Sequence, residues 1–159
     1  MTPVFAIWNK EFKDTFVSPI AYLVVAIFLV VTGWFFFSTF FIKGQASLRD
    51  FFNLLPMTFA FVIPALTMRL FAEEFNVGSY EVLITMPVKP VEIIISKFLA
   101  GLTVVAAMLL PTLAYAVSVS FLGELDPGPV IGGYVGALLL GGAFCGVGLL
   151  TSALTRNQI

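Results

Sequence analysis

Long runs of uncharged, mostly apolar residues alternate with short polar segments along this chain. The uncharged runs extend from Thr15 to Ile42, from Phe51 to Met68, from Phe98 to Gly123 and from Pro127 to Thr155. Each run reaches the roughly 18–20 residues that a helix needs to cross about 30 Å of hydrocarbon. Buried helices of a soluble core would show a polar face, and these runs show none. The pattern therefore predicts an all-α, polytopic membrane protein with four transmembrane helices, over residues 18–42, 51–68, 93–123 and 128–155.

The segment before the first run predicts a helix of another kind. One stripe at helical spacing consists of Phe5, Trp8, Phe12 and Phe16, whereas Lys10, Lys13 and Asp14 lie on the other side. We expect residues 3–16 to form an interfacial helix, with its aromatic side chains in the lipid boundary and its lysines near anionic headgroups. The alternative is that this helix continues the first span inward.

The fourth run is rich in glycine. Gly132 and Gly136 are four residues apart, as are Gly142 and Gly146. Pairs of small residues at this spacing let two membrane helices approach closely. We expect these four glycines to be helix-packing residues, either within the subunit or at a seam between two copies.

Composition narrows the possible chemistry. Hydrophobic residues make up 60% of the 159 residues and charged residues only 11%, against about a quarter charged in soluble domains. The chain has no histidine, which removes the commonest general base and metal ligand. The uncharged runs hold no titratable pair for a membrane enzyme or a proton relay. We therefore expect no enzyme activity and no catalytic, cofactor-binding or metal-binding residue. Cys145 is expected only to fill space.

The basic residues predict the orientation in the membrane. With the N-terminus inside, the cytoplasmic segments hold Lys10, Lys13, Arg69, Lys89, Lys97 and Arg156, and the outer loops hold only Lys43 and Arg49. This asymmetry follows the positive-inside rule. We expect a cytoplasmic N-terminus, outer loops near Gln45 and Leu125, and a cytoplasmic segment over residues 69–92. The formal net charge of −1 offers no basic field to nucleic acid.

The stretch "RLFAEEFNVGSYEVLITMPV" is the most polar long segment of the chain. Gly78 and Ser79 offer a break and a helix cap, and Pro87 is a stop signal, so Tyr80 to Met86 can make about two helical turns between them. A helix this short is unstable alone in water. Its apolar side chains need cover, and the residues alone leave open whether a partner protein or the lipid surface provides it.

The same stretch resembles the signature between the second and third spans of ABC-2-type transporter permeases. The matching residues are Glu73, Glu74, Gly78, Ser79, Glu81, Leu83, Thr85, Pro87 and Val88. The segments "KEF" and "SPIAY" before and at the first span, and "LTRNQI" after the fourth, are also similar to these permeases. The "SPIAY" start is similar in particular to permeases related to the bacterial gliding-motility transporter, although Val17 departs from that pattern.

The resemblance implies a single permease domain over residues 1–159, of a six-helix, type V exporter-like kind. Because the chain stops after the fourth span, we expect this domain to be incomplete at the C-terminus. Residues 69–92 would hold a coupling helix that docks on a cytoplasmic ABC ATPase. The coupling interface is expected at Glu73, Glu74, Gly78, Ser79, Tyr80, Glu81, Leu83, Thr85, Met86 and Pro87.

The function implied by the resemblance is that of a permease subunit, which couples ATP hydrolysis in a separate chain to substrate export across the bacterial inner membrane. No G-x-x-x-x-G-K-[ST] phosphate loop occurs in this sequence, so ATP and Mg²⁺ are expected on the partner and no cofactor on this chain. The expected partners are the ABC ATPase, a second permease copy or a paralogous permease, and the lipid bilayer. The alternative is a non-transporting membrane subunit of an ATP-driven remodelling or motility complex.

Overall fold

The computed structural model describes residues 3–17, 19–45, 47–77 and 90–154, and these form five helices. They are α1 (Pro3–Val17), α2 (Pro19–Lys43), α3 (Arg49–Val77), α5 (Pro90–Leu122) and α6 (Pro127–Leu154). No strand occurs within the described ranges. The four helices after α1 are long and apolar enough to cross a membrane. The predicted all-α, polytopic membrane architecture is therefore confirmed.

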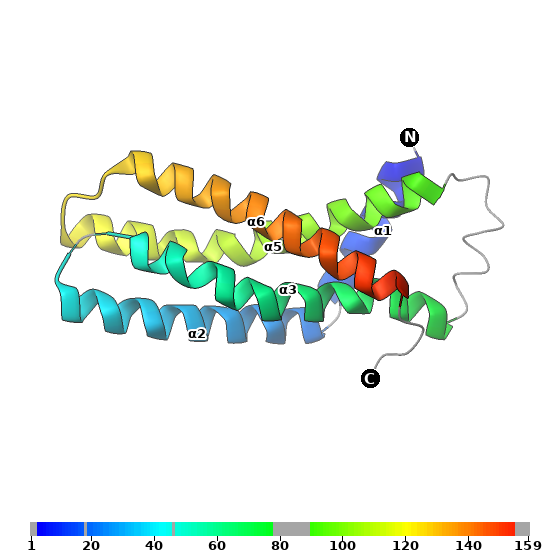
Figure 1. Cartoon of the computed structure of the whole chain (residues 1–159), viewed down its shortest axis with the longest axis horizontal. Helices are drawn as coiled ribbons and strands as arrows, with labels where there is room; N and C mark the ends of the chain where they lie inside the picture. The colour runs from blue at the N-terminus through cyan, green and yellow to red at the C-terminus, as the bar shows by residue number, and fades with distance from the viewer. Residues whose placement is uncertain (1–2, 18, 46, 78–89, 155–159) are drawn as a thin grey trace.

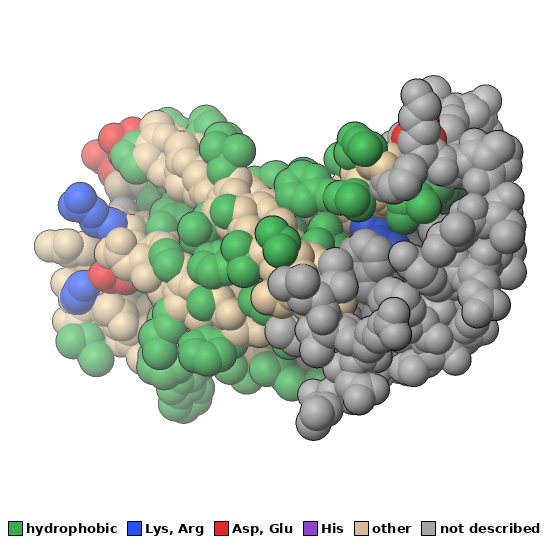
Figure 2. Space-filling model, turned by 45° about the vertical axis from the view of Figure 1, so that its right-hand side comes forward, with side chains coloured by type: hydrophobic (Ala, Val, Ile, Leu, Met, Phe, Trp, Pro, Cys, Tyr) green, Lys and Arg blue, Asp and Glu red, His purple; other side chains and the backbone are tan. Residues whose placement is uncertain are grey.

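The four long helices run alternately in opposite directions along the bundle (Figure 1). At one end α2 connects to α3 and α5 connects to α6, and we call this the loop end. The other end, called the terminal end, holds the start of α1 at Pro3, the end of α3 at Val77, the start of α5 at Pro90 and the end of α6 at Leu154. Hydrophobic side chains cover the middle of the described surface, and charged side chains gather at the loop end (Figure 2). This distribution fits a bundle that spans a bilayer lengthwise.

The helix boundaries reflect the local sequence. Four of the five helices begin at a proline, whose missing N–H is not needed in the first turn. Ser47 Oγ accepts a hydrogen bond from the Arg49 N–H at 3.2 Å and so caps the start of α3. At the end of α2, Gly44 has a φ of 59° and donates its N–H to the Phe40 carbonyl at 2.9 Å. Glycine suits this left-handed position because it has no Cβ.

Aromatic rings fill the half of the bundle next to the loop end. Phe36 of α2 and Phe51 of α3 are almost fully buried, and their ring centroids lie 6.0 Å apart. Tyr115 of α5 lies 5.9 Å from each of these two rings. Edge-on and offset aromatic contacts of this kind favour a fixed geometry. Three helices are thereby held together by interlocking rings.

Helix α3 extends beyond the apolar run of the second span, and α1 packs against another helix. The expected second span covers residues 51–68, and α3 continues beyond it without interruption to Val77. The N-terminal helix was expected to lie on lipid or to continue the first span. Helix α1 packs mainly against α5 and is turned away from the axis of α2 (Figure 1), and its place at the lipid surface stays a prediction. The aromatic stripe itself is present, with centroids of Phe5 and Trp8 at 5.4 Å and of Trp8 and Phe12 at 5.7 Å.

Candidate functional site

Two of the residues expected to contact an ATPase lie at the terminal end of the described bundle. Glu73 and Glu74 lie on the helical backbone of α3, close to its last residue, Val77. The remaining expected contact residues, Gly78, Ser79, Tyr80, Glu81, Leu83, Thr85, Met86 and Pro87, lie outside the described residues. The two helices that flank these residues are described, and α3 ends and α5 begins at the same end of the bundle (Figure 1). The coupling role of these residues stays a prediction.

Near this end, α3 and α6 cross in close backbone contact. Thr67 of α3 is fully buried, and its hydroxyl is shared between the carbonyls of Ile63, at 3.0 Å, and Pro64, at 3.2 Å. A Cβ atom built on Gly148 of α6 would overlap the Thr67 hydroxyl and lie only 3.3 Å from the Pro64 Cα. The two helices therefore meet with almost no side chain between their backbones.

Helix α5 joins the same crossing. A Cβ atom on Gly101 would lie 3.2 Å from the Cys145 Sγ and 3.7 Å from the Thr67 Cγ2. The Cys145 side chain is fully buried. Thr67, Gly101, Cys145 and Gly148 thus form a compact contact of α3, α5 and α6, which we call the three-helix junction. It lies ten residues before the end of α3, which is roughly 15 Å along a helix.

Buried polar side chains mark this half of the bundle. Ser96 and Lys97 of α5 are fully buried, and Ser152 of α6 is only 3% exposed. Lys97 falls within the expected third span, residues 93–123, and in the structure its side chain engages a partner. A buried ammonium group requires such an interaction.

The close approaches of α6 use other glycines than the two pairs with GxxxG spacing. Gly132, Gly136 and Gly146 have no described side chain within 4 Å of a built Cβ, and Gly142 makes ordinary contacts with Leu102 at 3.4 Å and Phe98 at 3.6 Å. The tight contacts involve Gly133 against Phe52, Gly141 against Val105 and Gly148 against Thr67. The packing role assigned to the two pairs stays a prediction. Spacing alone did not indicate which glycines face the neighbouring helices.

The described side chains also bear on metal chemistry. Within the described ranges, no group of three or more His, Cys, Asp or Glu side chains is placed to hold a metal ion.

Comparison with known proteins supplies the family. A family model described as "ABC-2 family transporter protein" matches residues 43–159. The match begins at the last residue of α2 and includes α3, α5, α6 and the segment 78–89 between α3 and α5. No curated protein and no solved structure matches the chain significantly. Because the family match covers most of the chain, this protein belongs to the ABC-2 family of transporter proteins and is a permease-type membrane component of an ABC transporter.

Proposed function

We propose that this chain is the permease subunit of an exporter in the bacterial inner membrane and that a separate cytoplasmic ABC ATPase docks on residues 78–89. The observation that carries the proposal is the family match over residues 43–159, which includes this segment together with both helices that flank it. In this proposal the terminal end and the N-terminus face the cytoplasm, and the loop end faces outward. ATP and Mg²⁺ bind to the ATPase, and this chain holds no cofactor.

The energy of ATP binding would enter as motion of the segment 78–89. That segment connects directly to α3 and α5, and both helices meet α6 at the three-helix junction. Close-packed contacts have few intermediate arrangements, so a shift at one end is passed on as a movement of whole helices. We infer that α3, α5 and α6 tilt together when the ATPase closes, and that a second permease copy or a paralogue forms the other wall of the pathway.

The docking contact should depend on the apolar residues Leu83 and Met86. A two-turn cytoplasmic helix cannot cover them by itself, and a groove of the ATPase is the cover that we propose. Replacing Leu83 with Glu would place an unpaired carboxylate in that groove, at a cost of about 2–5 kcal/mol of binding free energy. Glu81 would contribute about 1 kcal/mol or less as an exposed charge at the rim.

The test is copurification of the ATPase with detergent-solubilised variants of this chain. We expect Leu83→Glu to lose the ATPase. Gln45→Glu adds the same charge to an exposed position at the loop end and should retain it. Copurification of the Leu83→Glu variant at the wild-type yield would refute the proposed contact. Stimulation of ATPase activity by a substrate in the reconstituted complex would then distinguish export from a non-transporting role.

A further inference from the structure

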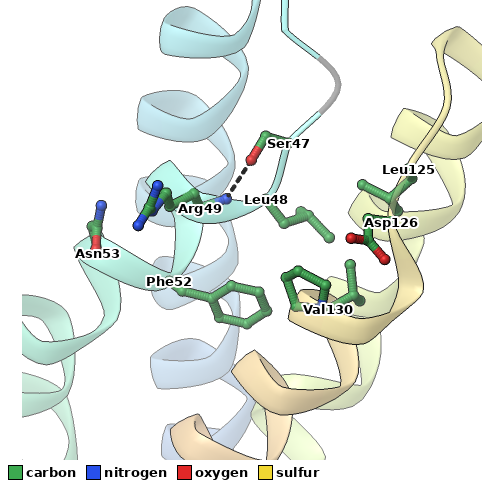
Figure 3. Close-up of a pocket in the computed structure, with 9 residues that line it drawn as sticks. Ser47, Leu48, Arg49, Phe52, Asn53, Leu125, Asp126 and Val130 are labelled. Atoms are coloured by element: carbon green, nitrogen blue, oxygen red, sulfur yellow. Dashed lines mark hydrogen bonds between the residues drawn. The ribbon is translucent and has the colours of Figure 1, made fainter.

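A pocket of about 410 Å³ opens at the loop end of the bundle, far from the proposed ATPase contact (Figure 3). It lies between the start of α3 and the start of α6. Its lining residues are Ser47, Leu48, Arg49, Phe52, Asn53, Leu125, Asp126, Pro129 and Val130. Pockets of roughly 300–1,000 Å³ with mostly apolar walls and a few polar groups are typical small-molecule sites.

Opposite charges stand at the two sides of this pocket. Arg49 and Asn53 lie on one side, with their polar groups pointing away from Asp126 on the other side, and the apolar side chains of Leu48 and Phe52 lie between them (Figure 3). Arg49 is exposed, so its long side chain can turn over the pocket mouth. The pocket therefore offers a cationic group, an anionic group and an apolar floor to one ligand.

Both charged groups can accept a ligand without losing a structural contact. The neighbouring Asp50 is engaged by Lys43 at 2.7 Å, and within the described part of the chain the Arg49 guanidinium makes no hydrogen bond or ion pair. One carboxylate oxygen of Asp126 accepts the Gly128 N–H at 3.2 Å. The second oxygen remains available, since an ionised carboxylate has about four acceptor positions.

The level of the pocket in the membrane restricts the ligand. The candidate membrane spans of α3 and α6 begin at Arg49 and Pro127, and these positions bound the pocket. Lipid headgroups lie at the level where a spanning helix leaves the hydrocarbon. A membrane lipid can therefore reach the pocket from the side, with its acyl chains remaining in the bilayer.

We propose that this pocket binds the headgroup of a zwitterionic phospholipid that carries a primary ammonium group. Its phosphate would be held by the Arg49 guanidinium, a preferred phosphate ligand, with the Asn53 amide as a second donor. Its ammonium group would donate to Asp126, and its glycerol region would cover Phe52 and Val130. An anionic lipid would also bind Arg49, but its headgroup would be repelled by the negative charge of Asp126. A choline lipid would place no N–H donor against that carboxylate.

The chain offers variants that separate the pocket from general charge effects. Arg49→Gln removes the phosphate ligand. Asp126→Asn removes the negative charge, while the amide oxygen can still accept the Gly128 N–H and preserve the start of α6. The matched controls are Lys13→Gln and Glu124→Gln, which remove the same charges at exposed positions and do not line the pocket. Lys43 is left unchanged, because it engages Asp50 beside Arg49.

The experiment is native mass spectrometry of the purified chain with equimolar phosphatidylethanolamine, phosphatidylcholine and phosphatidylglycerol. We expect wild type and both controls to prefer phosphatidylethanolamine. Each pocket variant should lower its affinity about tenfold, the size expected for a lost hydrogen bond between charged groups, and Asp126→Asn should abolish the preference over phosphatidylglycerol.

Soluble phosphoethanolamine, which carries the same charges without acyl chains, identifies the source of the ligand. We expect it not to displace the bound lipid at equal concentration, because the apolar floor contributes to binding. Three results would overturn the proposal: equal binding of the three lipids to wild type, equal losses in the controls, or displacement by phosphoethanolamine. No ATPase is present in this measurement, so its outcome is independent of the proposed transport role.

Discussion

Gly148 of α6 lies against Thr67 of α3 with no room for a methyl group between them. The contact is unusual because its polar partner is already satisfied, since the Thr67 hydroxyl donates to carbonyls of its own helix. Pro64, one turn earlier, lies inside α3 and cannot donate a backbone hydrogen bond. The crossing therefore combines a weakened turn of α3 with a backbone contact to α6, close to the proposed ATPase contact.

Replacing Gly148 with Ala should destabilise the protein. The added methyl group would overlap the Thr67 hydroxyl and approach the Pro64 Cα at 3.3 Å, and backbone atoms cannot turn aside as a flexible side chain can. Overpacking of this kind costs about 1–3 kcal/mol. Thermal unfolding of the purified protein in detergent should show a Tm several degrees below that of wild type.

Gly146→Ala is the matched control for this measurement. Gly146 is two residues away on the same helix, and a Cβ atom there would meet no described atom within 4 Å. Alanine is better than glycine inside a helix by roughly 0.5–1 kcal/mol. We expect an unchanged or higher Tm for this variant. Equal Tm values for the two variants would show that the close contact at Gly148 is absent in the protein.

A second close approach, between Gly33 of α2 and Tyr115 of α5, allows a double-mutant test. The Tyr115 hydroxyl donates to the Leu29 carbonyl at 3.0 Å and would lie 2.9 Å from a Cβ on Gly33. Tyr115 cannot easily move, because Phe36, Phe37 and Phe51 surround its ring. We expect Gly33→Ala to cost about 1–3 kcal/mol in the wild-type background.

The same change should be nearly neutral when Tyr115 is Phe. Without the hydroxyl, the nearest ring atom would be the Cζ at 3.5 Å, which is an ordinary contact distance. Tyr115→Phe alone should cost about 0.6 kcal/mol, the average for hydrogen bonds within membrane bundles. The Tm values of the four proteins should therefore be non-additive. Additive effects would contradict the close contact between the two residues.

The number and class of the helices could be predicted from the sequence, because every segment that crosses lipid must satisfy its own backbone hydrogen bonds. A segment such as residues 18–42 is long, apolar and uncharged, so it must satisfy its backbone as a helix in lipid. The end of α3 was harder to predict. Charged residues such as Glu73 and Glu74 indicate where the hydrocarbon ends, but they do not stop a helix, and α3 continues to Val77.

Helix orientation and side-chain burial could not be predicted in the same way. Gly132 and Gly136 have the spacing of a packing pair, yet Gly133, one residue along, is the glycine that contacts Phe52 of α3. All faces of α6 are similarly apolar, so hydrophobicity does not show which face is inward. The burial of Lys97 depends likewise on the helices around it, and a single sequence does not specify their arrangement.

Lys97 should be important for the stability of the terminal half of the bundle. Its side chain is fully buried in α5 and engages a partner. Lys97→Ala would remove both that interaction and the buried methylene groups, at an expected cost of about 3–5 kcal/mol. Lys97→Met keeps most of the volume and should cost less. Folded yield after membrane extraction and Tm would be measured for both variants.

Lys13→Ala provides the comparison for Lys97, because Lys13 is exposed on α1 and loses only a surface charge. It should stay within about 0.5 kcal/mol of wild type. If Lys97→Ala behaved like Lys13→Ala, then Lys97 would not be enclosed in the folded protein.

The proposed orientation can be tested with single cysteines. Cys145 is fully buried beside Gly101, so Cys145→Ala provides a thiol-free background in which the smaller side chain still fits. Gln45→Cys and Glu124→Cys place thiols at exposed positions in the two connections of the loop end, and Gly78→Cys places one just after α3.

A membrane-impermeant maleimide should label positions 45 and 124 in intact cells and should reach position 78 only after permeabilisation. The reason is the excess of lysine and arginine at the terminal end, since such an excess is retained in the cytoplasm. Labelling of position 78 in intact cells, with protection of 45 and 124, would invert the orientation and remove the segment 78–89 from the reach of a cytoplasmic ATPase.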